Sequence, residues 1–268
     1  MSVLDEILAT KRDEVTVLRQ PQTRDLLRRH ALDAPPTRPF GAALRSPDRH
    51  VAVVAEIKRR SPSKGELAAD LDPATTAKAY ETGGAAALSV LTDGPYFGGS
   101  VADLQVARQA ASLPVLRKDF TIDEIQVYEA RAIGADAILL IVAALPDDAL
   151  LADLHSLATD LGLGVLVEAH DAREIDRALD AGAGVVGVNS RDLATFTEDL
   201  GVAESLAGRL PPDVIAVAES AVRTPADAER MGGAGFDAVL AGEALVRAAD
   251  PAAVVAGFSR AIVERRRA

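Results

Sequence analysis

The segment GVLVEAHDAREIDRALDAGAGVVGVNS (164–190) decides the fold, because it contains two apolar runs separated by a stretch of helical length. The runs GVLVEA (164–169) and VVGVNS (185–190) are rich in Val and Leu, which is typical of strands buried on both faces of a parallel sheet. The residues between them are enough for a crossover helix, and Gly182-Ala183 suits the end of such a helix. A strand, a helix and a second strand in this order indicate an α/β protein.

The same alternation continues in both directions and gives eight predicted strands. They are AVVAEIK (52–58), AALSVL (86–91), PVLRKD (114–119), AILLIV (137–142), GVLVEA (164–169), VVGVNS (185–190), VIAVAES (214–220) and DAVLAGE (237–243). A Gly-Ala pair precedes every second run, at Gly84-Ala85, Gly134-Ala135, Gly182-Ala183 and Gly233-Ala234. Three other runs follow a helix end of a different type, at Leu113-Pro114, Leu161-Gly162 and Leu210-Pro211-Pro212. Four units of two strands and two helices therefore predict a (βα)₈ TIM barrel, with a doubly wound open sheet as the alternative.

The residues before the first strand predict a helical extension rather than a separate domain. Residues 3–19 should form an amphipathic helix, whose mostly apolar face carries Leu4, Ile7, Leu8, Lys11, Val15 and Leu18. The segment 23–46 should be tied to the barrel through Leu26, Leu27 and Phe40. We therefore expect an N-terminal helical extension over residues 1–50, packed on a barrel over residues 51–268, as one domain overall.

The composition limits the classes of function. With 49% hydrophobic and 26% charged residues, the 268-residue chain should be globular. No apolar run approaches the ~18–20 residues of a membrane span, and the charged N-terminus does not look like a signal peptide, so we expect a cytoplasmic protein without a membrane partner. The absence of cysteine excludes disulfides, thiolate metal sites and cysteine nucleophiles. A net charge of −11 argues against a nucleic-acid partner.

Polar side chains gather at the carboxyl ends of the predicted strands, which is where the loops of a TIM barrel build the active site. They are Glu56, Lys58, Lys118, Glu168, Asn189, Glu219 and Ser220. Glu56 and Lys58 lie two residues apart in one strand and should both point into the barrel mouth. Solvent-exposed ion pairs would explain one such residue, whereas the whole set predicts an active site.

Two loops at the same end of the barrel have features of ligand binding. The loop 59–72 is long and contains proline, glycine and serines, so it could act as a lid. The loop 92–100 places Tyr96 and Phe97 beside glycines. An aromatic ring on such a loop can cover a flat ligand or simply hold the loop in place.

An anionic ligand is indicated by small residues and by basic ones. Backbone amides after the last two predicted strands, at Ser220-Ala221 and Ala241-Gly242-Glu243, should receive phosphate, although ordinary tight turns would look the same. Seven basic residues should make the mouth cationic: Lys58, Arg59, Arg60, Lys64, Arg117, Lys118 and Arg191.

Neither a metal nor a cofactor is predicted. His30, His50, His155 and His170 have no metal-ligand spacing, and we interpret all four as surface or packing residues. The sequence contains no P-loop, no dinucleotide-binding motif and no Gly-x-Ser-x-Gly nucleophile elbow.

Eight blocks carry a resemblance to a known family. They are LDEILATKRDEV (4–15), AEIKRRSPSKG (55–65), SVLTDGPYFGGS (89–100), VLRKDF (115–120), VEAH (167–170), GVNSRDL (187–193), AES (218–220) and LAGEAL (240–245). In these blocks and in their order the chain resembles the indole-3-glycerol-phosphate synthases. That family converts 1-(o-carboxyphenylamino)-1-deoxyribulose 5-phosphate to indole-3-glycerol phosphate, carbon dioxide and water in tryptophan biosynthesis, without a metal or cofactor.

The resemblance implies a role for each candidate residue. Lys118 would be the general acid at the substrate carbonyl, and Glu168 would act as base or orient the anilino nitrogen. Lys58, paired with Glu56, would hold the substrate and serve the later dehydration, and Asn189 would hold hydroxyl groups.

The remaining candidates would hold the substrate. Their implied roles are a polar rim from Arg191, Glu219 and Ser220, phosphate binding by Ser61 and the amides of Ser220–Ala221 and Gly242–Glu243, and a sandwich of the anthranilate ring between Phe97 and Phe120. Two positions depart from the family pattern, because Ala221 replaces a glycine and Ala241 a larger aliphatic residue. If the turn at Ala221 needs a positive φ, alanine costs on the order of 1 kcal/mol there.

Other functions fit parts of the same pattern. Phosphoribosylanthranilate isomerase, a related barrel, would be expected to use a cysteine, and the chain has none. A Schiff-base aldolase with Lys118 as nucleophile and a non-catalytic barrel that binds a phosphometabolite are the alternatives. The expected partner is a small anionic substrate that joins a phosphosugar to anthranilate, bound by a monomer or a weak homo-oligomer.

Overall fold

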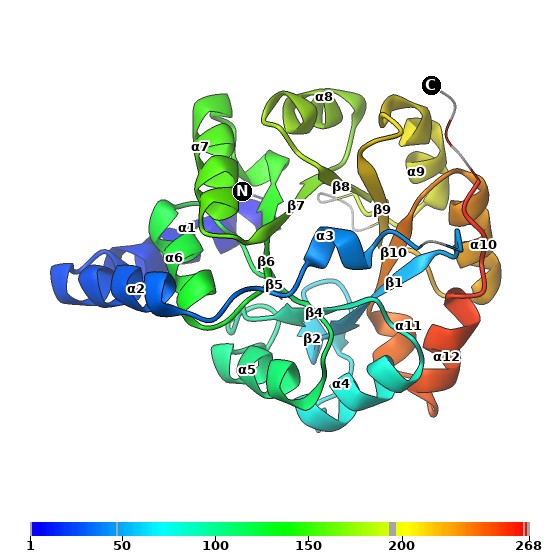
Figure 1. Ribbon diagram of the computed structural model, residues 1–268, viewed down its shortest axis with the longest axis horizontal. Helices are drawn as coiled ribbons and strands as arrows, with labels where there is room; N and C mark the ends of the chain where they lie inside the picture. The colour runs from blue at the N-terminus through cyan, green and yellow to red at the C-terminus, as the bar shows by residue number, and fades with distance from the viewer. Residues whose placement is uncertain (1, 47, 193–196, 265, 267–268) are drawn as a thin grey trace.

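The computed structural model describes residues 2–46, 48–192, 197–264 and 266, so Leu193 at the end of the block 187–193 and the chain end at 267–268 lie outside it. Eight parallel strands of the described chain close into a barrel in the order β1-β10-β9-β8-β7-β6-β5-β4, and helices surround them (Figure 1). The predicted (βα)₈ barrel is confirmed. The open sheet is wrong, because β1 pairs with β4 on one side and with β10 on the other.

The predicted strands match the observed ones to within two residues at either end. The barrel strands are β1 (Ala52–Ile57), β4 (Ala87–Leu91), β5 (Val115–Lys118), β6 (Ala137–Ile141), β7 (Gly164–Ala169), β8 (Val185–Asn189), β9 (Ile215–Glu219) and β10 (Ala238–Ala241). The loop after β1 contains a small antiparallel hairpin of β2 (Arg60–Ser61) and β3 (Gly65–Glu66).

Most helices of the barrel begin at a side chain that caps them. The helices are α4 (Pro73–Thr82), α5 (Val101–Ala110), α6 (Glu124–Ala132), α7 (Asp148–Asp160), α8 (Ala172–Asp180), α9 (Leu200–Leu206), α10 (Pro225–Gly233), α11 (Glu243–Val246) and α12 (Pro251–Phe258). Caps that accept a backbone N–H are Asp72, Ser100, Asp123, Asp147, Asp171, Asp199, Thr224 and Asp250. Each such cap stabilises its helix by about 0.5–2 kcal/mol. None of the helices in the described part of the chain is long and apolar enough to cross a membrane.

Glycines end three of the helices as the sequence predicts. In the fourth helix the predicted end at Gly233 is wrong. Gly84, Gly134 and Gly182 have φ between +86° and +89°, in the left-handed region that glycine enters without a Cβ penalty. In the fourth unit, Gly233 is still the last residue of α10, and Gly235 takes the left-handed conformation with φ +95°. The helix is simply longer there than the Gly-Ala pattern indicates.

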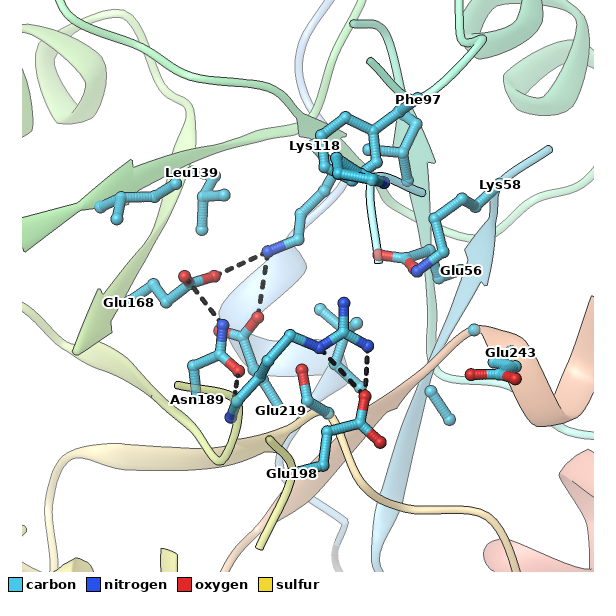
Figure 2. Close-up of a pocket in the computed structure, with 18 of the residues that line it drawn as sticks. Glu56, Lys58, Phe97, Lys118, Leu139, Glu168, Asn189, Glu198, Glu219 and Glu243 are labelled. Atoms are coloured by element: carbon cyan, nitrogen blue, oxygen red, sulfur yellow. Dashed lines mark hydrogen bonds and ion pairs between the residues drawn. The ribbon is translucent and has the colours of Figure 1, made fainter. Parts of the chain in front are cut away.

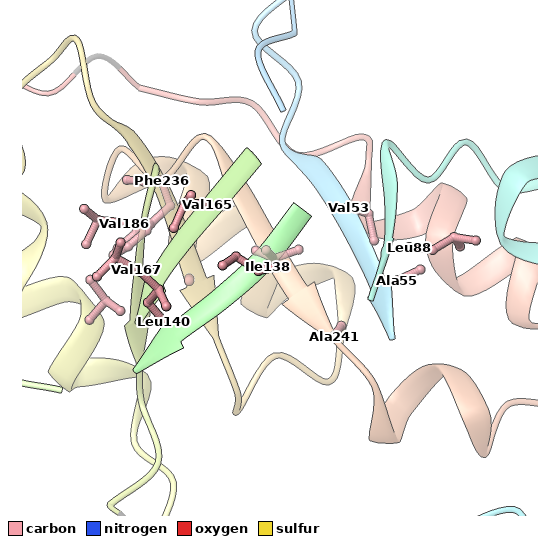
Figure 3. Close-up of a cluster of buried hydrophobic side chains, with 14 of the residues drawn as sticks. Val53, Ala55, Leu88, Ile138, Leu140, Val165, Val167, Val186, Phe236 and Ala241 are labelled. Carbon is pink, nitrogen blue, oxygen red and sulfur yellow. The ribbon is translucent and has the colours of Figure 1, made fainter. Parts of the chain in front are cut away.

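Alternate residues of each strand face opposite sides of the barrel wall, and this alternation positions the site. In β1, Val53 and Ala55 pack outward, in the core between the strands and the helices (Figure 3), whereas Val54 packs in the barrel interior. Because side chains alternate along a strand, Glu56 at the carboxyl end of β1 also faces the interior, and Lys58 follows two residues later.

The N-terminal helix is present as expected and contributes to the carboxyl end of the barrel. Helix α1 (Val3–Leu18) begins with a capping box between Ser2 and Asp5. Lys11, on its predicted inner face, is buried and forms ion pairs with Asp93 and Asp119, at 3.0 and 2.9 Å. These two aspartates lie just past the carboxyl ends of β4 and β5, so this end of the barrel holds α1.

The rest of the extension is tied to the barrel through Phe40, as the sequence predicts, but not through Leu26. In α2 (Pro21–Asp33), Leu26 is 43% exposed and Leu27 is half-buried, so the expected apolar anchor at Leu26 is wrong. The guanidinium of Arg38 attaches the segment instead, because it donates to the carbonyl oxygens of Ala111 and Leu113 at 2.9 and 2.7 Å. Helix α2 covers part of α6 rather than the barrel wall.

The amino end of the barrel is closed by α3 (Phe40–Ala43). Phe40 and Leu44 are fully buried there, in one cluster with Ala52, Ala137 and Ile215, which lie at the beginnings of three strands. Burial of such a side chain stabilises the fold by roughly 1.5–3 kcal/mol. In the described part of the chain, the amino end of the barrel is therefore filled by side chains, and the carboxyl end is the side from which we expect a ligand to enter.

Candidate active site

A cavity lies at the carboxyl end of the barrel, and almost all predicted site residues line it. They are Glu56, Lys58, Phe97, Lys118, Phe120, Glu168, Asn189, Arg191, Glu219, Ser220, Ala221, Gly242 and Glu243. Val3, Leu4 and Ile7 of α1 line the cavity as well. The site therefore combines the strand ends of the barrel with the first turns of the N-terminal helix.

The centre of the cavity is an ammonium group between two carboxyl groups (Figure 2). Lys118 Nζ, at the end of β5, donates to Glu168 Oε2 on β7 at 2.8 Å and to Glu219 Oε2 on β9 at 3.1 Å. Asn189, at the end of β8, donates from Nδ2 to Glu168 Oε1 at 3.0 Å, while its Oδ1 accepts from the Arg191 backbone N–H at 3.0 Å. These bonds hold the carboxylate of Glu168 at both oxygens.

The three charged groups differ in their proton affinity. Burial lowers the pKa of Lys118, but Glu168 and Glu219 outweigh burial and raise it above the ordinary value. Burial likewise opposes ionisation of Glu168, yet Lys118, His170 and Asn189 lower its pKa to about 2. For Glu219 burial prevails and raises the pKa to about 8, because Lys118 is shared with the charged Glu168. At neutral pH the cluster therefore contains an ammonium, a carboxylate and a carboxylic acid.

Two glycines make room for the glutamates. A Cβ atom at Gly187, in β8, would lie 1.9 Å from Glu219 Oε1. A Cβ atom at Gly242 would lie 2.4 Å from Glu56 Oε1. Glu56 forms an ion pair with Lys58 at the end of β1, so this pair occupies the side of the cavity next to β10.

The turn after β9 has the positive φ angles that would make alanine unfavourable at position 221. Ser220 and Ala221 have φ +63° and +60°, so both lie in the left-handed region. A non-glycine residue loses about 1–2 kcal/mol in this conformation. On the neighbouring strand, Gly242 precedes the first turn of α11.

Three charged residues that line the cavity, Asp119, Glu198 and Arg223, are not among the predicted site residues. Glu198 accepts from Arg191 Nε at 3.0 Å and also pairs with Arg223, and both Glu198 and Arg223 line the cavity. Arg191 also donates to Ser63 Oγ at 3.3 Å, which links the loops after β1 and β8. Glu198 and Arg223 lie in loops outside the apolar runs, so periodicity gives no signal for them; only their charge could have indicated a role.

The two rings of the expected aromatic sandwich contact each other in this structure, and the sandwich itself stays a prediction. The rings of Phe97 and Phe120 contact each other, with centroids 6.1 Å apart and planes tilted by 38°. A third ring between parallel planes would need two stacking distances of at least ~3.5 Å each. Both rings line the cavity on one side, and their tilted contact explains why they pack as a pair.

The expected cationic mouth is only partly present. Of the seven basic residues, Lys58, Lys118 and Arg191 line the cavity. Arg117 faces the opposite side of β5, because it precedes Lys118 by one residue, and it pairs with Asp119 and Glu129.

Two more basic residues and Ser61 serve the loops instead. Arg59 pairs with Asp103 on α5, and Arg60 donates to the carbonyl oxygens of Gly94 and Pro95. Ser61 is buried, accepts from the Lys64 backbone N–H at 3.3 Å and is not among the residues that line the cavity. The expected contact of Ser61 with phosphate stays a prediction.

His170 is not the surface or packing residue that we expected. Its Nε2 lies 3.5 Å from Glu168 Oε1, and its Nδ1 lies 3.0 Å from Glu174 Oε2. Burial would lower the pKa of His170, but Glu174 and Glu168 raise it. The sequence does contain a signal for this position, because His170 follows Glu168 by two residues and side chains two apart in a strand point to the same side. Among the described residues, no group of three or more His, Asp or Glu side chains could hold a metal ion.

Comparisons with known proteins agree on one family. The family model described as indole-3-glycerol phosphate synthase matches residues 4–258. The indole-3-glycerol phosphate synthase of Leifsonia xyli is 55% identical over 85% of this chain and 86% of that protein. Indole-3-glycerol phosphate synthase 2 of Streptomyces coelicolor is 50% identical over 96% and 98%. A crystal structure of 3-hexulose-6-phosphate synthase has a TM-score of 0.62 at 21% identity, covers 80% of this chain and all of that one, and supports the fold alone.

Proposed function

The chain belongs to the indole-3-glycerol phosphate synthase family, and we propose that Lys118 and Glu168 perform the proton transfers of its reaction. The enzyme is a decarboxylating lyase of tryptophan biosynthesis that acts on a small phosphorylated substrate. It closes the pyrrole ring of 1-(o-carboxyphenylamino)-1-deoxyribulose 5-phosphate and releases carbon dioxide and water.

Lys118 is the proposed general acid at the substrate ketone. Attack by the carboxylated ring carbon makes the ketone oxygen negative, so a proton donor beside that oxygen lowers the barrier. The observation that carries this role is the position of Lys118 Nζ, which lines the cavity and is held at 2.8 and 3.1 Å by two carboxyl groups. Because these groups raise its pKa, Lys118 is an ammonium when the substrate binds.

Glu168 is the proposed base. After carbon dioxide leaves, the new ring becomes aromatic only when the ketone oxygen departs as water and the substrate gives up one proton. Glu168 has a pKa lowered to about 2, so it is ionised, and Asn189 fixes its second oxygen. The hydrogen bond to Lys118 returns the captured proton to the acid that lost one.

The remaining residues are proposed to hold the substrate. Lys58, paired with Glu56, lines the cavity just past β1 and would bind the departing hydroxyl group, so that both protons of the leaving water come from Lys118. The amides of Ser220–Ala221 and Gly242–Glu243 would receive the phosphate, supported by their place on the cavity wall. Phe97 and Phe120 would cover one face of the anthranilate ring as a pair.

The Schiff-base alternative needs a neutral Lys118. The raised pKa of Lys118 keeps the amine protonated, which removes its nucleophilic electron pair and argues against that chemistry. We also propose that the enzyme acts in the cytoplasm, as a monomer or weak homo-oligomer, without a nucleic-acid or membrane partner. The net charge of −11 supports the absence of nucleic acid.

Product fluorescence tests this assignment directly, because the chain has no tryptophan and the product contains an indole ring. Lys118→Ala should lower kcat by about 10²–10⁴ while the far-UV circular dichroism is kept. Lys118→Arg should fail nearly as badly, since guanidinium gives up its proton much less readily. Retention of most activity by either variant would remove Lys118 from the mechanism.

A further inference from the structure

The reaction takes up one proton from solvent in each turnover. The ketone oxygen leaves as water and needs two protons, the carboxylate leaves as carbon dioxide without releasing one, and aromatisation returns one. The proposed acid and base are buried, with 15% of the Lys118 side chain and 4% of the Glu168 side chain exposed. A bound substrate fills the cavity in front of them. Proton uptake during turnover therefore needs a route that does not cross that cavity.

His170 and Glu174 provide such a route on the other side of Glu168. Glu168 lines the active-site cavity, whereas His170 and Glu174 line a second cavity. Asn189 and Arg191 line both cavities and so form the wall between them. The series of side chains Glu168, His170 and Glu174 therefore leads from the active-site cavity to the second cavity.

The distances along this chain suit proton transfer. His170 Nδ1 lies 3.0 Å from Glu174 Oε2, and the same oxygen accepts from the His170 backbone N–H at 2.8 Å, which fixes the ring. The other nitrogen, Nε2, is buried, has no hydrogen-bond partner in the described residues and lies 3.5 Å from Glu168 Oε1. A shift of a few tenths of an ångström would complete that hydrogen bond.

The charges around His170 favour a protonated ring. The groups that face it are Glu168 on β7, Glu174 on α8, Glu219 on β9 and, around the second cavity, Arg191, Asp192 and Asp199. Carboxylates predominate, and imidazole can exchange a proton at either nitrogen near neutral pH.

We propose that His170, held by Glu174, delivers the solvent proton to Glu168 during turnover. The Nε2–H bond of the imidazolium breaks, and the proton joins Glu168 Oε1. Once its O–H group has turned from the side of Oε1 toward Lys118 Nζ, Glu168 passes this proton to the neutral amine of Lys118, and the imidazole regains a proton from water in the second cavity. His170 thus acts through Glu168, and the inference rests on the proposed role of Glu168 as base.

His170→Gln tests the relay, because glutamine keeps a hydrogen-bond donor but cannot exchange a proton. We expect kcat to fall by about tenfold or more with KM within about twofold, and added imidazole to restore part of the loss. The loss should grow as the pH rises, since protons become scarcer. His155→Gln is the matched control, because His155 lies on α7 and lines neither cavity; it should behave like the wild type.

A second variant covers the case in which His170→Gln does not fold. Glu174→Gln keeps the shape but removes the carboxylate behind the ring, so it should lower kcat in the same direction and flatten its pH profile. An unchanged kcat in the variant that folds, or a loss that imidazole does not relieve in His170→Gln, overturns the relay. Glu168→Gln separates the two proposals: if it stays active, the role of Glu168 fails, and if it is inactive while His170→Gln matches the wild type, only the relay fails.

Discussion

Lys11 and Lys118 are both buried ammonium groups held between two carboxyl groups, yet their surroundings differ. Lys11 pairs with Asp93 and Asp119 and also with Glu14. Burial lowers the pKa of Lys11, but Asp119, Glu14 and Asp93 outweigh burial and raise it, as the glutamates do for Lys118. The pKa values of the two lysines therefore shift in the same direction, and the pairing alone does not distinguish a structural lysine from a catalytic one.

The difference lies in the carboxyl groups. Asp119 has further cationic and hydroxyl partners in Arg117 and Thr92, and these, with Lys11, lower its pKa despite burial. Asp93 accepts from the backbone N–H groups of Tyr96 and Phe97. Glu219, in contrast, keeps a raised pKa, and its Oε1 has no partner among the described residues. The Lys11 cluster, in which both aspartates accept from further donors, fastens α1 to the barrel, whereas the Lys118 cluster contains a glutamate with a raised pKa and is available for a reaction.

Exchange of each lysine for methionine should separate the two functions with the largest effects. Lys11→Met leaves two buried carboxylates without their shared cation and should lower the free energy of unfolding by about 3–5 kcal/mol. Lys118→Met should destabilise less, because Glu219 is already protonated and Glu168 keeps Asn189, but it should lower kcat by about 10²–10⁴.

Urea unfolding and indole fluorescence measure the two effects on the same samples. If Lys11→Met proved as stable as the wild type, or Lys118→Met the less stable of the two, the comparison would be wrong. Activity of Lys11→Met, measured well below its unfolding midpoint, should exceed that of Lys118→Met.

Glu168→Gln should break the catalytic cluster without breaking the fold. Glutamine can still bond to Lys118 and Asn189 but cannot take up a proton as a carboxylate does, so kcat should fall by at least about 10². Glu129→Gln is the matched control, because Glu129 pairs with Arg117 on the outer side of β5. Single-turnover rates should be near wild type for Glu129→Gln; equal losses in both variants would contradict a specific role of Glu168.

The raised pKa of Glu219 should appear in the pH dependence of stability. Between its ordinary pKa of 4.5 and about 8, the native state keeps a proton that the unfolded chain releases. The free energy of unfolding should therefore fall as the pH rises through this window, by at most about 1.4 kcal/mol per pH unit. Glu168 acts in the opposite sense below pH 4.5, where its stabilising contribution is lost as the pH falls toward about 2. Glu219→Gln should reduce the slope above pH 4.5; an unchanged slope would show that Glu219 is ionised.

Ala221→Gly should give the smallest effect. Glycine relieves the left-handed strain at φ +60°, so the variant should gain up to about 1 kcal/mol in stability or bind inorganic phosphate more tightly. Ala218→Gly, three residues earlier in β9, should be destabilised instead, because extended buried backbone gains nothing from glycine. Thermal unfolding and phosphate titration of both variants test the sign, and a loss in Ala221→Gly would show that the turn is not strained.

The barrel and the central residues could be predicted because they follow from the backbone period. Buried strands read as apolar runs, so a charge at a strand end, such as Lys118 or Glu168, is conspicuous. The same rule, applied strictly, would have excluded Arg117, because a residue next to Lys118 must face the helices. Arg117 therefore does not belong to the predicted cationic mouth.

The rest of the site depends on contacts between distant loops, which have no period. Arg223 approaches Glu198 only because the barrel brings the loops after β8 and β9 together. The tilt of Phe97 against Phe120 is decided by packing across 23 residues of sequence. His170 follows Glu168 by two residues, so the alternation of side chains along a strand predicts that the two lie on the same side. Metal-ligand spacing gives no signal for His170.

The close approach of two glutamates to two glycines limits the substitutions that the active site can accept during evolution. A side chain at Gly187 would collide with Glu219, and one at Gly242 would collide with Glu56. Each glycine can therefore change only if the neighbouring carboxyl group moves from its place or the glutamate becomes shorter. A lineage that fills either glycine position after shortening the glutamate would meet this collision again when the glutamate returns. Directed-evolution libraries that vary one member of such a pair should return the original residue, whereas libraries that vary both together can leave it.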